Sequence, residues 1–149
     1  MLLRIDLEDP GTIRTIEACA GAVDELAGHQ VIAMVEPFIS RRVGGKVGND
    51  LTPDAVIRSI AIASGLGRTS AYTWLKLPCV PEMERVMAAS TLPALILGGE
   101  VSEDPDVALA GWAEALALPT VRGLVIGRSL LYPPGDDVAA AVDNVVGLL

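Results

Sequence analysis

Short apolar runs alternate along the chain with longer segments whose apolar residues recur every three or four positions. The runs have the length and composition of buried strands and occupy residues 2–7, 31–35, 72–77, 93–97 and 121–126. Helical spacing follows each run, as in residues 13–26 after the first. Because no two predicted strands are adjacent in sequence, the pattern predicts an α/β fold of five alternating βα units around a parallel sheet.

Helix starts are marked most clearly in two places. Thr52 and Asp104 are favoured N-cap residues, and each is followed by proline and an acidic residue. Residues 40–51 show neither the alternation of a strand nor the spacing of a helix. They combine Arg41, Arg42 and Lys46 with glycine and asparagine. We therefore predict a mobile basic loop there.

Length and composition fit one domain, residues 1–149, with a substantial aliphatic core. Hydrophobic residues make up 51% of the chain, aromatic residues 3%, and the mean hydropathy is +0.47. A net charge of −8 argues against nucleic acid or an anionic membrane as a partner. Two cysteines are too few for a disulfide framework, which favours a cytoplasmic protein, and no apolar run is long enough to span a membrane.

Polar residues and glycines gather where the predicted strands end. In a parallel sheet these ends lie on one side, which is where active sites form. The residues at these positions are Asp6, Glu36, Lys76, Gly98, Gly99, Glu100, Gly127 and Arg128. We expect them to converge on one rim.

Lys76 is one of only two lysines in the chain and lies within an apolar strand. A buried, unpartnered lysine tends to lose its proton, and the neutral amine is a nucleophile toward carbonyls. Alternatively, Lys76 reaches solvent from an edge strand and discourages aggregation. The residues alone fit both interpretations.

The glycine-bearing strand ends have two interpretations as well. Backbone amides at Gly98, Gly99 and Gly127, together with Arg128, form a candidate phosphate cradle. Alternatively, the glycines only permit tight turns, and the carboxylate of Glu100 would repel a phosphate.

The single histidine, His29, falls at a predicted helix end, and no metal-ligand cluster is present in the sequence. We therefore expect neither a metal nor an organic cofactor.

The segment Trp74-Leu75-Lys76-Leu77-Pro78 resembles the Schiff-base strand of class I aldolases with a TIM-barrel fold. Leu95-Ile96-Leu97-Gly98-Gly99 and Val125-Ile126-Gly127-Arg128 are similar to the last two strands of those barrels. Val35-Glu36-Pro37-Phe38 and Arg58-Ser59-Ile60-Ala61 resemble actinobacterial deoxyribose-phosphate aldolase-like proteins.

The resemblance implies that the chain forms strands 4–8, the C-terminal part, of a TIM (β/α)8 barrel and lacks three N-terminal βα units. It implies a lyase of carbohydrate or inositol catabolism that makes or breaks a carbon–carbon bond. Lys76 would form the imine, and Asp6 and Glu36 would move protons. Gly98, Gly99, Gly127 and Arg128 would hold the anionic end of a carbonyl or sugar-phosphate substrate.

Two other functions fit the sequence. In one, the chain belongs to a different phosphate-binding enzyme and Lys76 makes only an electrostatic contact. In the other, it is an inactive fragment or a non-catalytic interaction module. Because an open five-stranded sheet has two free edges, we also expect a homo-oligomer, poor solubility or inactivity for the isolated chain.

Overall fold

The structure is a computed structural model that describes residues 1–99 and 104–149. The strands in these ranges are β1 (Leu2–Ile5), β2 (Ala33–Val43), β3 (Lys46–Asn49), β4 (Thr73–Pro78), β5 (Ala94–Leu97) and β6 (Val121–Val125). The helices are α1 (Gly11–Gly28), α2 (Pro53–Ser64), α3 (Met83–Met87), α4 (Pro105–Leu116), α5 (Arg128–Leu131) and α6 (Val138–Val146). None of these helices is long and apolar enough to cross a membrane.

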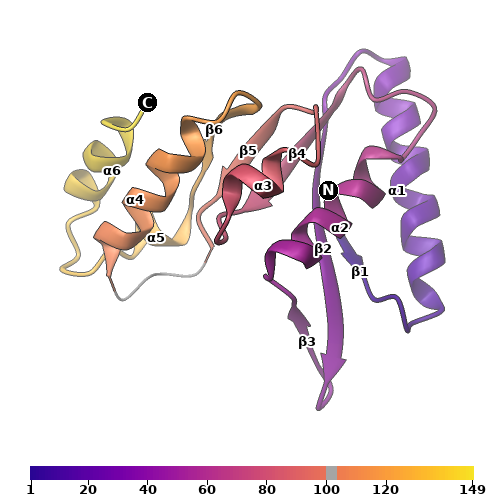
Figure 1. Ribbon diagram of the computed structural model, residues 1–149, viewed down its shortest axis with the longest axis horizontal. Helices are drawn as coiled ribbons and strands as arrows, with labels where there is room; N and C mark the ends of the chain where they lie inside the picture. Colours follow the sequence, from indigo (N-terminus) through magenta and orange to yellow (C-terminus); the bar gives the residue numbers. More distant parts are fainter. Residues whose placement is uncertain (100–103) are drawn as a thin grey trace.

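Five strands form a parallel sheet in the order β1-β2-β4-β5-β6, and β3 pairs with β2 in the antiparallel sense. The predicted parallel α/β architecture is therefore confirmed, with one strand more than expected. Successive parallel strands are added in one direction across the sheet, from β1 and α1 at one end to β6 and α6 at the other (Figure 1). Right-handed crossovers in such a sheet place the connecting helices on the same face.

Strand β2 is much longer than the sequence predicts, and residues 40–51 are not the expected loop. β2 continues to Val43, turns through Gly44 and Gly45, and returns as β3 (Figure 1). Both glycines have positive φ angles, +58° and +80°, which suit a tight hairpin turn. The glycines that indicated a loop are therefore the turn of a β-hairpin whose residues 41–49 are exposed.

Pro37 explains how β2 passes from one neighbour to the next. The Ala33 N–H donates toward β4, to the Tyr72 carbonyl, whereas the Glu36 N–H donates toward β1, to the Met1 carbonyl. Alternation therefore points position 37 toward β4, but proline has no N–H to donate. Accordingly, the β2–β4 pairing stops at Val35 and the pairing with β1 continues from Glu36 to Ile39.

Both predicted N-caps are present. The Thr52 hydroxyl accepts from the Ala55 N–H at 3.4 Å, and the Asp104 carboxylate accepts from the Asp106 N–H at 3.1 Å. These side chains satisfy donors that the first turn of a helix cannot pair internally. The sequence rule for helix starts therefore holds at α2 and α4.

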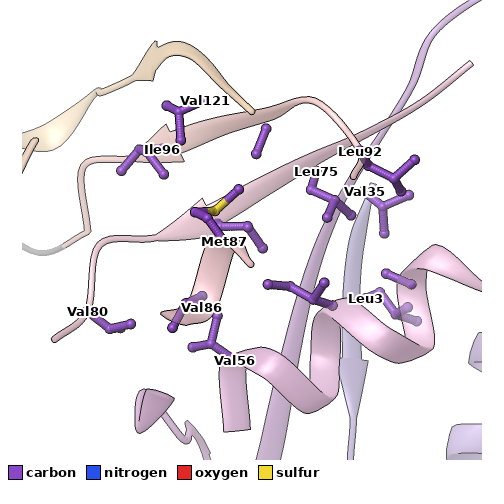
Figure 2. Packing of buried hydrophobic residues seen from close by; sticks show 14 of the residues in the cluster. Leu3, Val35, Val56, Leu75, Val80, Val86, Met87, Leu92, Ile96 and Val121 are labelled. Carbon is purple, nitrogen blue, oxygen red and sulfur yellow. The ribbon is translucent and has the colours of Figure 1, made fainter. Parts of the chain in front are cut away.

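The hydrophobic core lies between the sheet and the helix layer. Alternate strand residues point into it, and Figure 2 shows them meeting side chains from α2 and α3. The fully buried strand residues include Leu3, Ile5, Val35, Leu75, Leu77 and Ile96. Because neighbouring residues of a strand face opposite sides, this core fixes which side chains project from the other face of the sheet.

Candidate active site

Lys76 projects from the face of the sheet opposite the helix layer. Its strand neighbours Leu75 and Leu77 are both 0% exposed in the core, so alternation directs Lys76 to the other side. β4 is the middle strand of the five parallel strands, with β2 and β1 on one side and β5 and β6 on the other. The edge-strand interpretation of Lys76 is therefore wrong.

Glu36 meets Lys76 on this face. The Lys76 Nζ atom lies 3.2 Å from Glu36 Oε2, and each side chain is 23% exposed. Two expectations change as a result. Lys76 is neither fully buried nor without a partner. Glu36, which was expected at the end of its strand, is instead the fourth residue of β2. The pairing places a carboxylate base within hydrogen-bond distance of a primary amine.

Asp6 follows β1, as predicted, but the structure does not bring it to Lys76. Its Oδ1 atom accepts from the Glu8 N–H at 3.1 Å, and its carbonyl accepts from the Thr12 hydroxyl at 2.7 Å. These bonds shape the connection from β1 to α1. Asp6 therefore stands at the rim with one carboxylate oxygen already engaged by the backbone.

The four residues predicted to hold a phosphate lie at the ends of β5 and β6. The Gly98 N–H donates to the Val125 carbonyl at 3.3 Å, and Arg128 Nη2 donates to the Gly99 carbonyl at 3.1 Å. Gly99 has a φ angle of +68°, a conformation that favours glycine. Gly127 precedes α5, and Glu100 lies outside the described residues. Gly98, Gly99, Gly127 and Arg128 thus lie near one another, but the Gly98 N–H is engaged by the Val125 carbonyl and is not a donor for a ligand, contrary to the prediction.

The remaining chemically notable residues lie elsewhere. Lys46 is exposed at the start of β3, and His29 follows the last residue of α1. Burial raises the pKa of the Cys19 thiol, while burial and then the charge of Glu114 raise that of Cys79. In residues 1–99 and 104–149, no three His, Cys, Asp or Glu side chains are grouped to hold a metal ion.

Arg4 is a residue of this face that the sequence analysis missed. It lies between Leu3 and Ile5 in β1, both 0% exposed in the core, so its side chain projects to the same face as Glu36 and Lys76. The alternation of apolar and charged residues in Leu2-Leu3-Arg4-Ile5 was the signal that could have identified it.

Comparison with known proteins agrees with this architecture. A family model described as Cgl0159-like matches residues 1–146. The crystal structure of Cgl0159 from Corynebacterium glutamicum is 58% identical, with a TM-score of 0.95 over 99% of this chain and 49% of that one. No curated protein matches the chain.

More distant structures are class I aldolases. A Schiff-base-forming fructose-1,6-bisphosphate aldolase matches with a TM-score of 0.75 and 20% identity over 99% of this chain and 56% of that one. An archaeal fructose-1,6-bisphosphate aldolase, with its catalytic lysine bound to the carbinolamine intermediate, matches equally well at 19% identity. At such identity the likeness shows the fold, which is that of part of an aldolase barrel. The chain spans about half the length of these relatives, from 49% to 56%.

Proposed function

The chain belongs to the Cgl0159-like family, and from that premise we propose that it is the imine-forming part of a class I aldolase-like lyase. Lys76 is the amine that bonds to a carbonyl substrate, and a carbon–carbon bond of that substrate is then cleaved or formed. The substrate class is a carbonyl compound with a phosphate or other anionic group, as in carbohydrate or inositol catabolism.

One observation carries this proposal: the contact between the Lys76 amine and the Glu36 carboxylate on the face away from the core. An amine attacks a carbonyl only as the free base, so its proton must have an acceptor nearby. Glu36 Oε2 lies 3.2 Å from the amine and is the acceptor. Because both side chains are about a quarter exposed, a small molecule can reach them from the face of the sheet opposite the helix layer. We call this side of the sheet the open face.

The chemistry proceeds in balanced steps. Lys76 transfers a proton to Glu36, and its nitrogen attacks the carbonyl carbon to form a carbinolamine. Glu36 returns a proton to the carbinolamine hydroxyl, which leaves as water and gives a protonated imine. The imine accepts the electron pair of the carbon–carbon bond as that bond breaks, while a base removes the proton of the neighbouring hydroxyl. The base then gives its proton to the carbon of the resulting enamine, which restores the protonated imine. Water hydrolyses this imine, releases the second product and restores Lys76.

The other predicted residues have supporting parts in this scheme. Asp6 is a second candidate for the proton transfers at the breaking bond, with one oxygen committed to the Glu8 N–H. The Gly99 and Gly127 amides and the Arg128 guanidinium hold an anionic group at the ends of β5 and β6. The Gly98 amide, also predicted for this role, donates instead to the Val125 carbonyl. None of these roles requires a metal or an organic cofactor.

Borohydride trapping tests the proposal directly. The chain is incubated with dihydroxyacetone, dihydroxyacetone phosphate or glyceraldehyde 3-phosphate and reduced with borohydride, and the modified peptides are mapped by mass spectrometry. We expect a stable adduct on Lys76 and none on Lys46, which serves as an internal control because it is exposed on the hairpin. Lys76→Met removes the adduct, whereas Lys46→Arg retains it.

Two results contradict the proposal. One is a folded chain that gives no adduct with any of these carbonyl compounds. The other is equal modification of Lys46 and Lys76, since this would reflect ordinary lysine reactivity. Phosphate binding without any adduct would favour the alternative enzyme in which Lys76 makes only an electrostatic contact.

A further inference from the structure

Arg4 shares the open face of the sheet with the Lys76–Glu36 pair. The parallel register sets Leu2 opposite Glu36 and Arg4 opposite Phe38. Arg4 is therefore level with a position two residues beyond Glu36, nearer to the C-terminal ends of the strands. A substrate bonded to Lys76 and extending toward the rim passes this position. Arg4 is also exposed, so its guanidinium is accessible from the open face.

No described carboxylate neutralises Arg4. The ion pairs found in residues 1–99 and 104–149 involve Arg68, Lys76 and Arg85, and their distances are at most 3.5 Å. A charged guanidinium on the same face as Lys76 and Glu36, without an ion-pair partner among the described residues, is a receptor for an anion because it offers five N–H donors in a planar fork. Asp6 follows the end of β1, and its Oδ1 atom accepts from the Glu8 N–H.

The position of Arg4 relative to β4 indicates where on the substrate an anionic group would have to lie. Neighbouring strands lie about 4.8 Å apart, so β1, two strands from β4, is about 10 Å from Lys76 along the sheet. β6 is two strands from β4 on the other side and leads to Gly127 and Arg128. Arg4 and Arg128 therefore lie on opposite sides of Lys76 along the sheet.

We propose that Arg4 binds an anionic group of the carbonyl substrate on the β1 side of Lys76, opposite the Gly99–Arg128 end. This inference rests on the proposed imine chemistry and narrows its substrate class. The preferred ligand is a carbonyl compound with an anionic group on each side of the carbonyl carbon. Arg4 determines specificity and takes no part in the bond-making steps.

A matched pair of ketones tests the role of Arg4. Dihydroxyacetone and dihydroxyacetone 1,3-bisphosphate have the same carbonyl, and only the second has a phosphate on each side. The concentration for half-maximal borohydride trapping at Lys76 is measured for the wild type, Arg4→Gln and Arg14→Gln. Arg14 is an exposed arginine of α1, so its substitution removes the same charge from the opposite layer.

We expect Arg4→Gln to raise the half-maximal concentration of the bisphosphate about 10- to 100-fold, the loss typical of a hydrogen bond to a charged group. The value for dihydroxyacetone stays unchanged, and Arg14→Gln resembles the wild type for both ketones. If Arg4→Gln leaves the bisphosphate value unchanged, the inference is overturned while the imine chemistry stands.

A second measurement separates this inference from the proposed function. Inorganic phosphate is titrated into the isotope-labelled chain, and the Nε–H signal of Arg4 is followed by NMR. A saturable shift that disappears in Arg4→Gln supports anion binding even if the wild type traps no ketone, in which case only the imine proposal fails. The absence of a saturable Arg4 shift, together with equal trapping of both ketones, overturns the role of Arg4.

Discussion

The Lys76 amine and the Glu36 carboxylate lie 3.2 Å apart, although 40 residues separate them in the chain. They meet where the β2–β4 ladder has just ended at Val35 and where Pro37 offers no N–H to continue it. The two side chains thus meet at the point where β2 stops pairing with β4 and begins to pair with β1. This arrangement presents an acid–base pair on the open face of the central strand.

Replacing Glu36 by glutamine tests the acid–base half of the pair. Glutamine keeps the size and one oxygen but cannot accept and return a proton at this site. We expect Glu36→Gln to slow trapping at Lys76 about 100-fold or more, the usual size of a lost general acid–base contribution. The rate is measured by quenching with borohydride at successive times. Glu25→Gln on the exposed side of α1 is the charge-matched control, and an unchanged rate in Glu36→Gln would remove Glu36 from the mechanism.

Gly98 is a packing requirement at the end of β5. A Cβ atom at this position would lie 2.7 Å from Ile126 Cγ2 and 3.3 Å from Ile126 Cα, so the β5–β6 contact must shift. We expect Gly98→Ala to lower the free energy of unfolding by about 1–3 kcal/mol, as overpacking commonly does. The shift would also displace Gly99, which accepts the hydrogen bond from Arg128.

Gly21→Ala is the control for this substitution. Nothing lies within 4 Å of a Cβ atom at Gly21, inside α1, so alanine fits there without a clash. Alanine should stabilise the helix by about 0.5–1 kcal/mol relative to glycine. Urea unfolding monitored by circular dichroism gives the free energy of unfolding of both variants. If Gly98→Ala and Gly21→Ala change it by the same amount in the same direction, Gly98 is not required for packing against Ile126.

The two thiols predict a loss of stability at alkaline pH. Burial raises the pKa of Cys19 and of Cys79, so the folded chain retains protons that the unfolded chain releases. Their contribution is fully present below the unfolded thiol pKa of about 8.5 and is lost as pH rises through the higher folded values. Unfolding free energies from pH 7 to 10 should fall more steeply in the wild type than in the Cys19→Ala/Cys79→Ala variant.

The isolated chain should self-associate through its sheet edges. Within the described residues, β1 pairs only with β2, and β6 pairs only with β5. Leu2 and Val125 on these strands are 51% and 39% exposed, and open apolar edges recruit further strands. We expect sedimentation velocity to show dimers or larger species at micromolar concentration.

Lysine substitutions on the edges test this expectation. Leu2→Lys and Val125→Lys place a charge on each edge strand and should shift the chain toward monomer. Val107→Lys on α4, at a position that is 66% exposed, should leave the association unchanged. A wild-type chain that sediments as a single monomer would contradict the edge model.

Local sequence determined much of this fold. The spacing of apolar residues predicts the parallel strands and their helices because burial on one face requires that periodicity. Thr52 and Asp104 mark helix starts because their side chains can reach N–H groups a few residues away. The apolar run around Lys76 likewise indicated a strand of the sheet.

Tertiary structure decided what depends on partners distant in sequence. The length of β2 follows from its ladders with β1 and β3, so residues 40–51 looked irregular until those partners were in place. The sequence left open whether Lys76 is buried or reaches solvent, and only the packing of β2 beside β4 shows that its amine pairs with the Glu36 carboxylate. Arg4 became part of the same face because the core fixed the orientation of Leu3 and Ile5. A sequence specifies local hydrogen bonds and periodicity directly, whereas charge pairing across strands depends on the register that the assembled sheet selects.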